Sequence, residues 1–121
     1  MDTSALMMPV ECDVRVFDEL DRLLGPVEFI TPAAVIEELD SLATGAGEEA
    51  IAASVGRDLA ERCRVVETDA SYADDALVEL ADRGDCDYVV TNDGPLRDRV
   101  LERDVRVIGL RGRNKLTTTQ P

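Results

Sequence analysis

Apolar positions along the chain alternate between short continuous runs and stripes at helical spacing. Val14, Phe17, Leu20 and Leu24 recur as on one face of a helix. The run Tyr88-Val89-Val90-Thr91 is typical of a strand buried on both faces. Applied along the chain, these patterns predict helices over about 13–24, 32–44, 48–62, 72–83 and 95–103, and strands over about 27–30, 65–66, 88–91 and 105–108.

The alternation of strands and helices predicts an α/β domain with a mostly parallel sheet covered by helices. Thr31 and Pro32 are expected as the cap and first-turn proline of the second helix. The domain is expected to span residues 1–111, with a polar and mobile tail over 112–121. In parallel sheets of this kind, ligands bind beyond the carboxyl ends of the strands.

Charge and cysteine content narrow the function classes. The net charge is −13, from 26 acidic and 13 basic residues, and Lys115 is the single lysine. Such an acidic surface with almost no lysine is typical of proteins in molar salt, so we expect a halophilic source. The chain has no histidine and its three cysteines are far apart in sequence, which argues against zinc. Free thiols, no membrane-length apolar run and no signal-like start predict a cytoplasmic protein.

Acidic residues fall at the predicted strand ends, where chemistry is expected. Asp93 follows one strand, Asp2 opens the chain, Glu38 lies on the helix after another strand, and Asp74 and Asp75 lie in the first turn of a helix. Clustered carboxylates repel one another, and Mg²⁺ or Mn²⁺ relieves that repulsion because hard cations prefer oxygen ligands. Such ions can activate water against a phosphodiester without a histidine or lysine base.

Two interpretations of these acids remain open: a metal site, as above, or a purely structural role at the starts of helices. Asp74, Asp75 and Asp93 could simply begin their helices, where carboxylates are favoured. Within the pair, Asp74 lies nearer the apolar face of its helix, so we expect it to be the better ligand and Asp75 to support it or to interact with the helix dipole.

Four segments occur in an order that resembles the PIN-domain nucleases. They are Asp2-Thr3-Ser4, Val35-Ile36-Glu37-Glu38-Leu39, Tyr72-Ala73-Asp74-Asp75-Ala76 and Val90-Thr91-Asn92-Asp93. The last two, with Arg111-Gly112-Arg113-Asn114, look most like the ribosomal-RNA-processing branch and its archaeal relatives, and the VapC toxin branch is similar in general plan.

The resemblance implies a three-layer α/β/α fold and Mg²⁺- or Mn²⁺-dependent hydrolysis of single-stranded or structured RNA. It implies catalytic and metal-binding roles for Asp2, Glu38, Asp74 and Asp93, with Asp75 as a further ligand. Ser4 would support Asp2, while Thr91 and Asn92 would orient the loop that carries Asp93.

The chain departs from the family at its start. Members carry an apolar central strand directly before the first aspartate, whereas only Met1 precedes Asp2 here. We therefore expect the first strand to be truncated, and an apolar extension of about five to ten residues in the native protein.

RNA contacts are expected at Arg97 and, after the last predicted strand, at Arg111, Arg113 and Lys115, although solubilising roles are equally open. An antitoxin, a ribosome-assembly partner and a homodimer are further alternatives for partners. A PIN-like module that binds without cutting also stays open. A signalling receiver domain is disfavoured, because its acidic pair would follow the first strand.

Overall fold

The computed structural model describes all residues 1–121 and contains six α-helices and five strands. The helices are α1 (Thr3–Glu11), α2 (Val16–Leu24), α3 (Ala33–Ala43), α4 (Gly47–Leu59), α5 (Ala73–Arg83) and α6 (Gly94–Leu101), and a 3₁₀ turn (Ala60–Arg62) follows α4. The strands are β1 (Ile30–Pro32), β2 (Arg64–Val66), β3 (Tyr88–Val90), β4 (Arg106–Arg111) and β5 (Lys115–Thr119).

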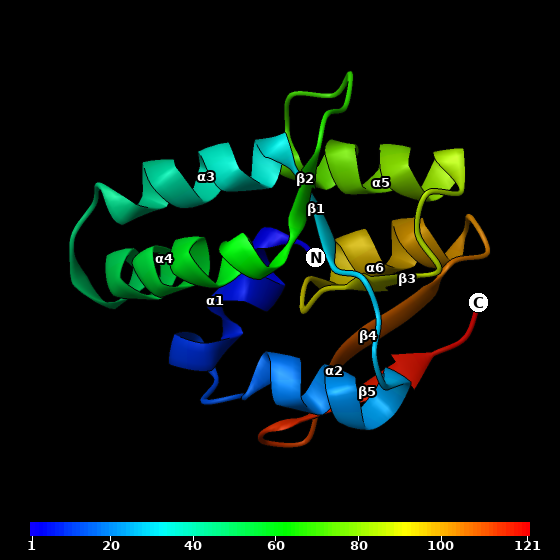
Figure 1. Ribbon diagram of the computed structural model, residues 1–121, viewed down its shortest axis with the longest axis horizontal. Helices are drawn as coiled ribbons and strands as arrows, with labels where there is room; N and C mark the ends of the chain where they lie inside the picture. Colours follow the sequence, from blue (N-terminus) through cyan, green and yellow to red (C-terminus); the bar gives the residue numbers. More distant parts are fainter.

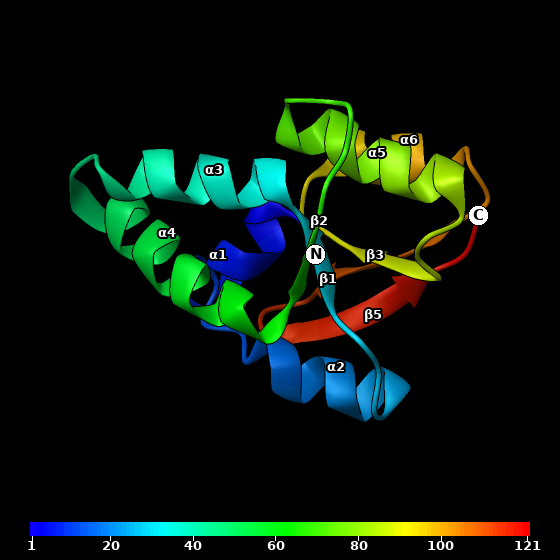
Figure 2. The same cartoon turned by 45° about the horizontal axis from the view of Figure 1, so that its top comes forward.

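The strands form two sheets. β1 pairs with β2 in parallel, while β3 pairs with β4 in parallel and β4 with β5 antiparallel. Helices α5 and α6 lie on one side of the β3–β4–β5 sheet and α2 lies on the other, so the fold has three layers (Figure 2). Helices α1, α3 and α4 pack together beside the sheets (Figure 1). The α/β class and the mostly parallel pairing predicted from the sequence are confirmed.

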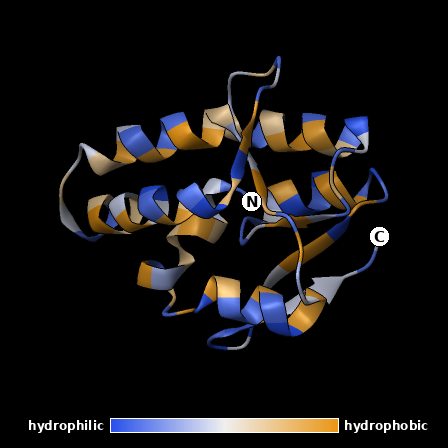
Figure 3. Ribbon diagram, in the orientation of Figure 1, coloured by the Kyte–Doolittle hydropathy of each residue, from blue (hydrophilic) through white to orange (hydrophobic).

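The apolar positions that predicted helices and strands from the sequence form the core of the protein. Leu20, Leu39 and Leu77, from three different helices, are almost completely buried, as are Val107 and Ile108 of β4. The hydropathy colouring places the apolar stripes of the helices toward the interior (Figure 3). None of the helices is long and apolar enough to cross a membrane.

Two predictions near the helix starts are wrong in detail. Helix α2 begins at Val16, because Asp13 adopts a left-handed backbone conformation with φ of 52°. Thr31 does not cap α3; Pro32 takes that position, and the buried Thr31 hydroxyl donates to the Met1 carbonyl at 2.8 Å. The predicted end of α5 is confirmed, since Gly84 closes the helix with a φ of 73° that favours glycine.

The carboxyl-terminal residues are not a mobile tail. Thr117, Thr118 and Thr119 are β-branched and pair with β4 in strand β5. Leu116 is buried, its N–H donates to the Glu19 carboxylate at 3.0 Å, and its carbonyl accepts from Arg22 at 3.1 Å. Polarity alone was therefore a poor guide to order in this segment.

Helix α1 was not predicted at all, and residues 1–2 lead into it between the two sheets. The Met1 ammonium donates to the Ile30 carbonyl at 2.7 Å, and the Asp2 N–H donates to the Val90 carbonyl at 3.2 Å. Met1 is buried, and this burial lowers the pKa of its amino group. Residues 1–2 thus bridge β1 and β3.

A groove of about 410 Å³ continues from Met1 between the two sheets. Its walls include Phe29, which precedes β1, Ile30 of β1, Val89 of β3 and Leu77 of α5. The lining is mainly apolar but also includes the charged residues Glu28, Arg64, Asp85 and Asp87.

Candidate active site

The turn after β3 presents Asp93. Val89 and Val90 are buried, which anchors the strand, and the chain then passes through Thr91 and Asn92 to Asp93. Asp93 occupies the N-cap position of α6, but its side chain makes no capping hydrogen bond. The half-buried carboxylate is consequently free for another ligand, and the simple capping interpretation does not account for it.

The side chain of Asp2, unlike that of Asp93, is buried and hydrogen-bonded. It is 3% exposed and caps α1, accepting the Ala5 N–H at 2.8 Å. The Ser4 hydroxyl donates to its carboxylate at 2.9 Å, and the Thr91 hydroxyl donates as well. Burial raises the pKa of Asp2 to about 6, although these hydrogen bonds act in the opposite direction. Three donors occupy most of the acceptor sites of one carboxylate, so Asp2 has little capacity left for another partner.

The same two hydroxyls connect Asp2 to the turn that carries Asp93. The Ser4 hydroxyl accepts the Asn92 N–H at 2.8 Å, and the Thr91 hydroxyl accepts the Asp93 N–H at 3.0 Å. The start of α1 and the end of β3 are thereby fixed to one another. Asp2 therefore contributes to the geometry of the Asp93 turn as well as carrying a charge.

Asp74 lies in the first turn of α5 and is exposed, and its pKa responds to the charges of two other acids. Partial burial raises the pKa of Asp74 first, and the charges of Asp93 and Glu38 raise it further. Glu38 is exposed on α3, and neither Glu38 nor Asp74 forms an ion pair. The fold thus brings carboxylates from α3, α5 and the end of β3 close enough to repel one another.

Asp75, the neighbour of Asp74, faces a different environment. Its carboxylate pairs with Arg99 of α6 at 2.9 Å. An ion pair between two half-exposed groups contributes little stability, but it occupies this carboxylate. Between the two aspartates, Asp74 is the one beside the other acids.

The acids do not form a ready-made metal centre. No group of three or more potential ligands is already arranged around one point. The donor set nevertheless fits a hard cation, because the converging groups all offer carboxylate oxygens. Glu38 and Asp74 are exposed and unpaired, so their side chains can change rotamer without breaking another contact.

The basic residues expected to contact RNA lie in two places. Arg97 of α6 pairs with Asp98 at 3.3 Å. Arg111, Arg113 and Lys115 are exposed on the β4–β5 hairpin and form no ion pair. Lys115 lines a polar depression with acidic residues from the start of α2, so this hairpin is not a purely basic surface.

Sequence reasoning missed two features beside the acids. Tyr72, at the cap position of α5, is 77% exposed. Glu79 and Arg83, about two and three turns further along α5, form hydrogen bonds that hold the preceding loop to the helix. The spacing of Glu79 and Arg83 signals a helical ion pair, but it does not reveal the loop contact.

The three-layer fold and the carboxylates of Glu38, Asp74 and Asp93 together indicate one class of protein, and comparison with known proteins identifies the family. A family model described as "PIN like domain" matches residues 1–113, so the chain belongs to the PIN-like domain family. The chain is similar to "Ribonuclease VapC4" of Methanocaldococcus jannaschii, with 25% identity over 114 residues that cover 91% of this chain and 87% of the relative.

A solved structure, the PIN domain endonuclease Utp24, shares the fold. It superposes with a TM-score of 0.79 at 22% identity, over 99% of this chain and 89% of that one. The α/β architecture expected from the resemblance to PIN-domain nucleases is therefore confirmed.

Proposed function

We propose that this protein is a metal-dependent endoribonuclease that cleaves RNA phosphodiester bonds, acting in RNA processing. The observation that carries the proposal is the placement of Glu38, Asp74 and Asp93 on three separate elements that meet near Asp74, whose pKa is raised first by burial and then by the charges of Asp93 and Glu38. Such repulsion is costly and is common where a protein performs chemistry. The nuclease names of the two relatives support the same class of reaction.

In this proposal the chain's residues divide into two groups. Asp93, Asp74 and Glu38 supply oxygens that would hold Mg²⁺ or Mn²⁺, while Asp75 follows Asp74 in the chain and its charge is balanced by Arg99. A bound ion would supply activated water and balance the charge of the phosphate. Asp2, with Ser4 and Thr91, holds the turn that aims Asp93.

The proposal is tested by cleavage of a single-stranded RNA oligonucleotide in millimolar Mn²⁺ and in excess EDTA. We expect the wild-type chain to cleave only with the metal, and Asp93→Asn and Asp74→Asn to lose at least about a hundredfold in rate, since each removes a charged ligand while keeping the side-chain shape. Because a chain of net charge −13 can be destabilised at low salt, the assay contains molar KCl.

A matched control is Asp58→Asn, which changes an exposed carboxylate of α4 that forms no ion pair. It should cleave at the wild-type rate. Near wild-type cleavage by a correctly folded Asp93→Asn would refute the site, and equal cleavage in EDTA would refute the metal dependence.

A toxin ribonuclease is the second candidate function, because the relative from Methanocaldococcus jannaschii is named as a VapC protein. The two roles differ in the effect of expression on a host. Growth arrest by the wild-type chain but not by Asp93→Asn, relieved by a co-expressed neighbouring gene product, would favour the toxin. Unimpaired growth combined with altered maturation of a defined RNA would favour processing.

A further inference from the structure

Tyr72 stands out among the few aromatic residues of the chain. Phe17 and Phe29 pack edge to face with ring centres 5.0 Å apart, and Tyr88 is half-buried beside Arg106. Tyr72 is 77% exposed, and its hydroxyl forms no hydrogen bond. The packing of the protein therefore does not explain an aromatic ring at this position.

Tyr72 lies close in the chain to the acidic edge, the name we give to the carboxylates of Glu38, Asp74 and Asp93. It is the N-cap residue of α5, two residues before Asp74, so the Cα atoms of the two residues are at most about 7–8 Å apart. Both side chains are exposed. A ligand bound at Asp74 would therefore lie within about one side-chain length of Tyr72.

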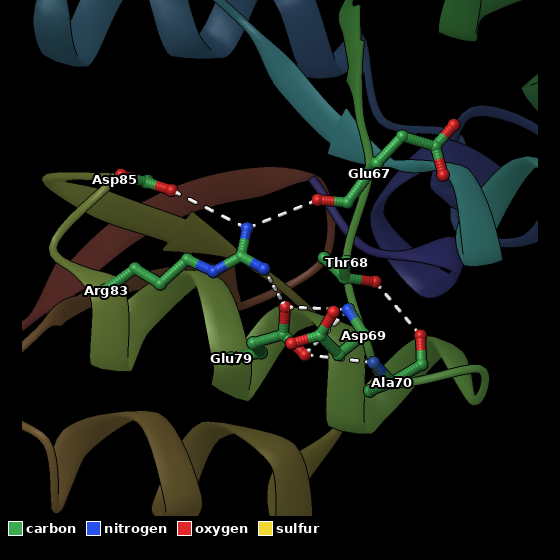
Figure 4. Close-up of polar contacts among 7 residues, drawn as sticks. All are labelled: Glu67, Thr68, Asp69, Ala70, Glu79, Arg83 and Asp85. Atoms are coloured by element: carbon green, nitrogen blue, oxygen red, sulfur yellow. Dashed lines mark hydrogen bonds and ion pairs between the residues drawn. The ribbon is translucent and has the colours of Figure 1, made fainter.

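The loop before Tyr72 is fixed to α5. The Glu79 carboxylate accepts the N–H groups of Asp69 and Ala70 at 2.9–3.0 Å, and these bonds lower the pKa of Glu79 (Figure 4). Arg83 pairs with Glu79 and donates to the Glu67 carbonyl at 3.2 Å (Figure 4). A side chain on a loop restrained in this way loses less conformational entropy when it binds a ligand.

We propose that Tyr72 is a stacking platform for the nucleobase next to the phosphate held at the acidic edge, and that it selects unpaired RNA. This inference rests on the proposed ribonuclease function. Aromatic rings commonly stack on bases of single strands, whereas bases in a duplex are already stacked and are not accessible. Stacking also suits a chain with twice as many acidic as basic residues, since it depends little on attraction of phosphate.

Kinetics of Tyr72→Ala and Tyr72→Phe test the platform. We expect Tyr72→Ala to raise KM about tenfold or more for single-stranded RNA, and Tyr72→Phe to retain wild-type KM because the ring remains. Tyr88→Ala is the matched control, because Tyr88 begins β3 and so lies at the end of the strand opposite Asp93.

An abasic substrate identifies the partner of the ring. In a scan of abasic positions along the oligonucleotide, one position should raise the wild-type KM about tenfold without a further increase in Tyr72→Ala, because the same contact is removed twice. Additive losses at every position, or unchanged kinetics in Tyr72→Ala while wild type cleaves, would overturn the platform and leave the proposed function intact.

A second measurement does not need activity. The chain has no tryptophan, so Tyr72→Trp in the otherwise unchanged chain introduces a single indole and keeps all the carboxylates. Single-stranded RNA with Ca²⁺, a hard cation that takes the same oxygen ligands, should quench its emission, whereas Tyr88→Trp should respond little. Absence of RNA binding by anisotropy, or binding without a larger change at position 72 than at 88, would overturn the inference. Absence of cleavage by the wild-type chain would instead refute the proposed function.

Discussion

The hydroxyl of Thr91 donates to the carboxylate of Asp2 across 89 positions of the chain and at the same time accepts the N–H of Asp93. One side chain thus joins the start of α1 to the turn after β3. Replacing it removes two contacts at once, which makes Thr91 the most informative position for testing how the acidic edge is held.

We expect Thr91→Val to destabilise the fold by about 1–3 kcal/mol, since valine leaves the Asp93 N–H without its partner. The nuclease activity should fall together with the stability, because the turn that carries Asp93 loses its hydrogen bond to the Thr91 hydroxyl. Thr91→Ser keeps the hydroxyl and should restore most of both properties. Urea denaturation and cleavage rates measure the two effects, and equal stability of the valine and serine variants would argue against the hydroxyl bridge.

Millimolar Mn²⁺ should raise the melting temperature of the wild-type chain in molar KCl. An ion at 100 times its Kd stabilises the folded state by roughly 2.7 kcal/mol. The shift should disappear in Asp93→Asn and persist in Asp58→Asn. A calorimetric scan that gives all three chains the same shift would indicate general binding to the acidic surface.

The pH dependence of stability should carry the signature of Asp2. Burial raises the pKa of Asp2 from 3.8 to about 6 in the folded state, so folding favours its protonated form. This contribution is fully present below about pH 4 and is lost as the pH rises through about 6. The difference between these two pKa values corresponds to roughly 3 kcal/mol in the free energy of unfolding.

Asp2→Asn removes that titration, so its stability should fall less than that of wild type between pH 4 and 7. Comparing the two chains cancels the general repulsion among the other carboxylates. Parallel curves from denaturant titrations at each pH would show that Asp2 titrates at an ordinary value when folded.

Local patterns were sufficient to predict most elements but not how the acids meet. Asp93 and Asp74 were found because strand ends and first helical turns are visible in the sequence. The contact between Thr91 and Asp2 joins residues 89 positions apart, and no periodicity encodes it. The pairing of Asp75 with Arg99 likewise depends on how α5 and α6 pack.

The missed elements have separate causes. Helix α1 contains Pro9 and carries apolar residues around much of its circumference, so it shows no clear amphipathic stripe. Strand β5 is polar apart from Leu116, and its order depends on pairing with β4 and on contacts with α2. In both cases tertiary packing determines a structure that local propensity does not show.

The groove between the sheets gives a prediction about stability. Five apolar residues such as Val-Val-Ile-Leu-Val placed before Met1 should pair between β1 and β3 and should replace a buried ammonium with an amide. Because the apolar side chains would be transferred from water into the groove, we expect the extension to raise the free energy of unfolding despite the entropy lost in ordering the added residues.

Five glycine and serine residues at the same place are the control, because they cannot fill the apolar walls. Only the apolar extension should raise the melting temperature in molar KCl. A similar temperature for both extended chains would mean that the groove does not accept a strand.

Gly56 of α4 shows how far the geometry of the acidic edge extends into the molecule. A Cβ atom there would lie 2.8 Å from the carbonyl oxygen of Leu6, and therefore α4 can approach the backbone of α1 only at a glycine. Asp2 caps helix α1 and Ser4 lies in its first turn, so displacing the helix would disturb the hydrogen bonds that hold the turn before Asp93. Inherited variation that alters the function of this protein can thus arise at Gly56, inside the molecule, where a survey restricted to the acidic residues would not find it.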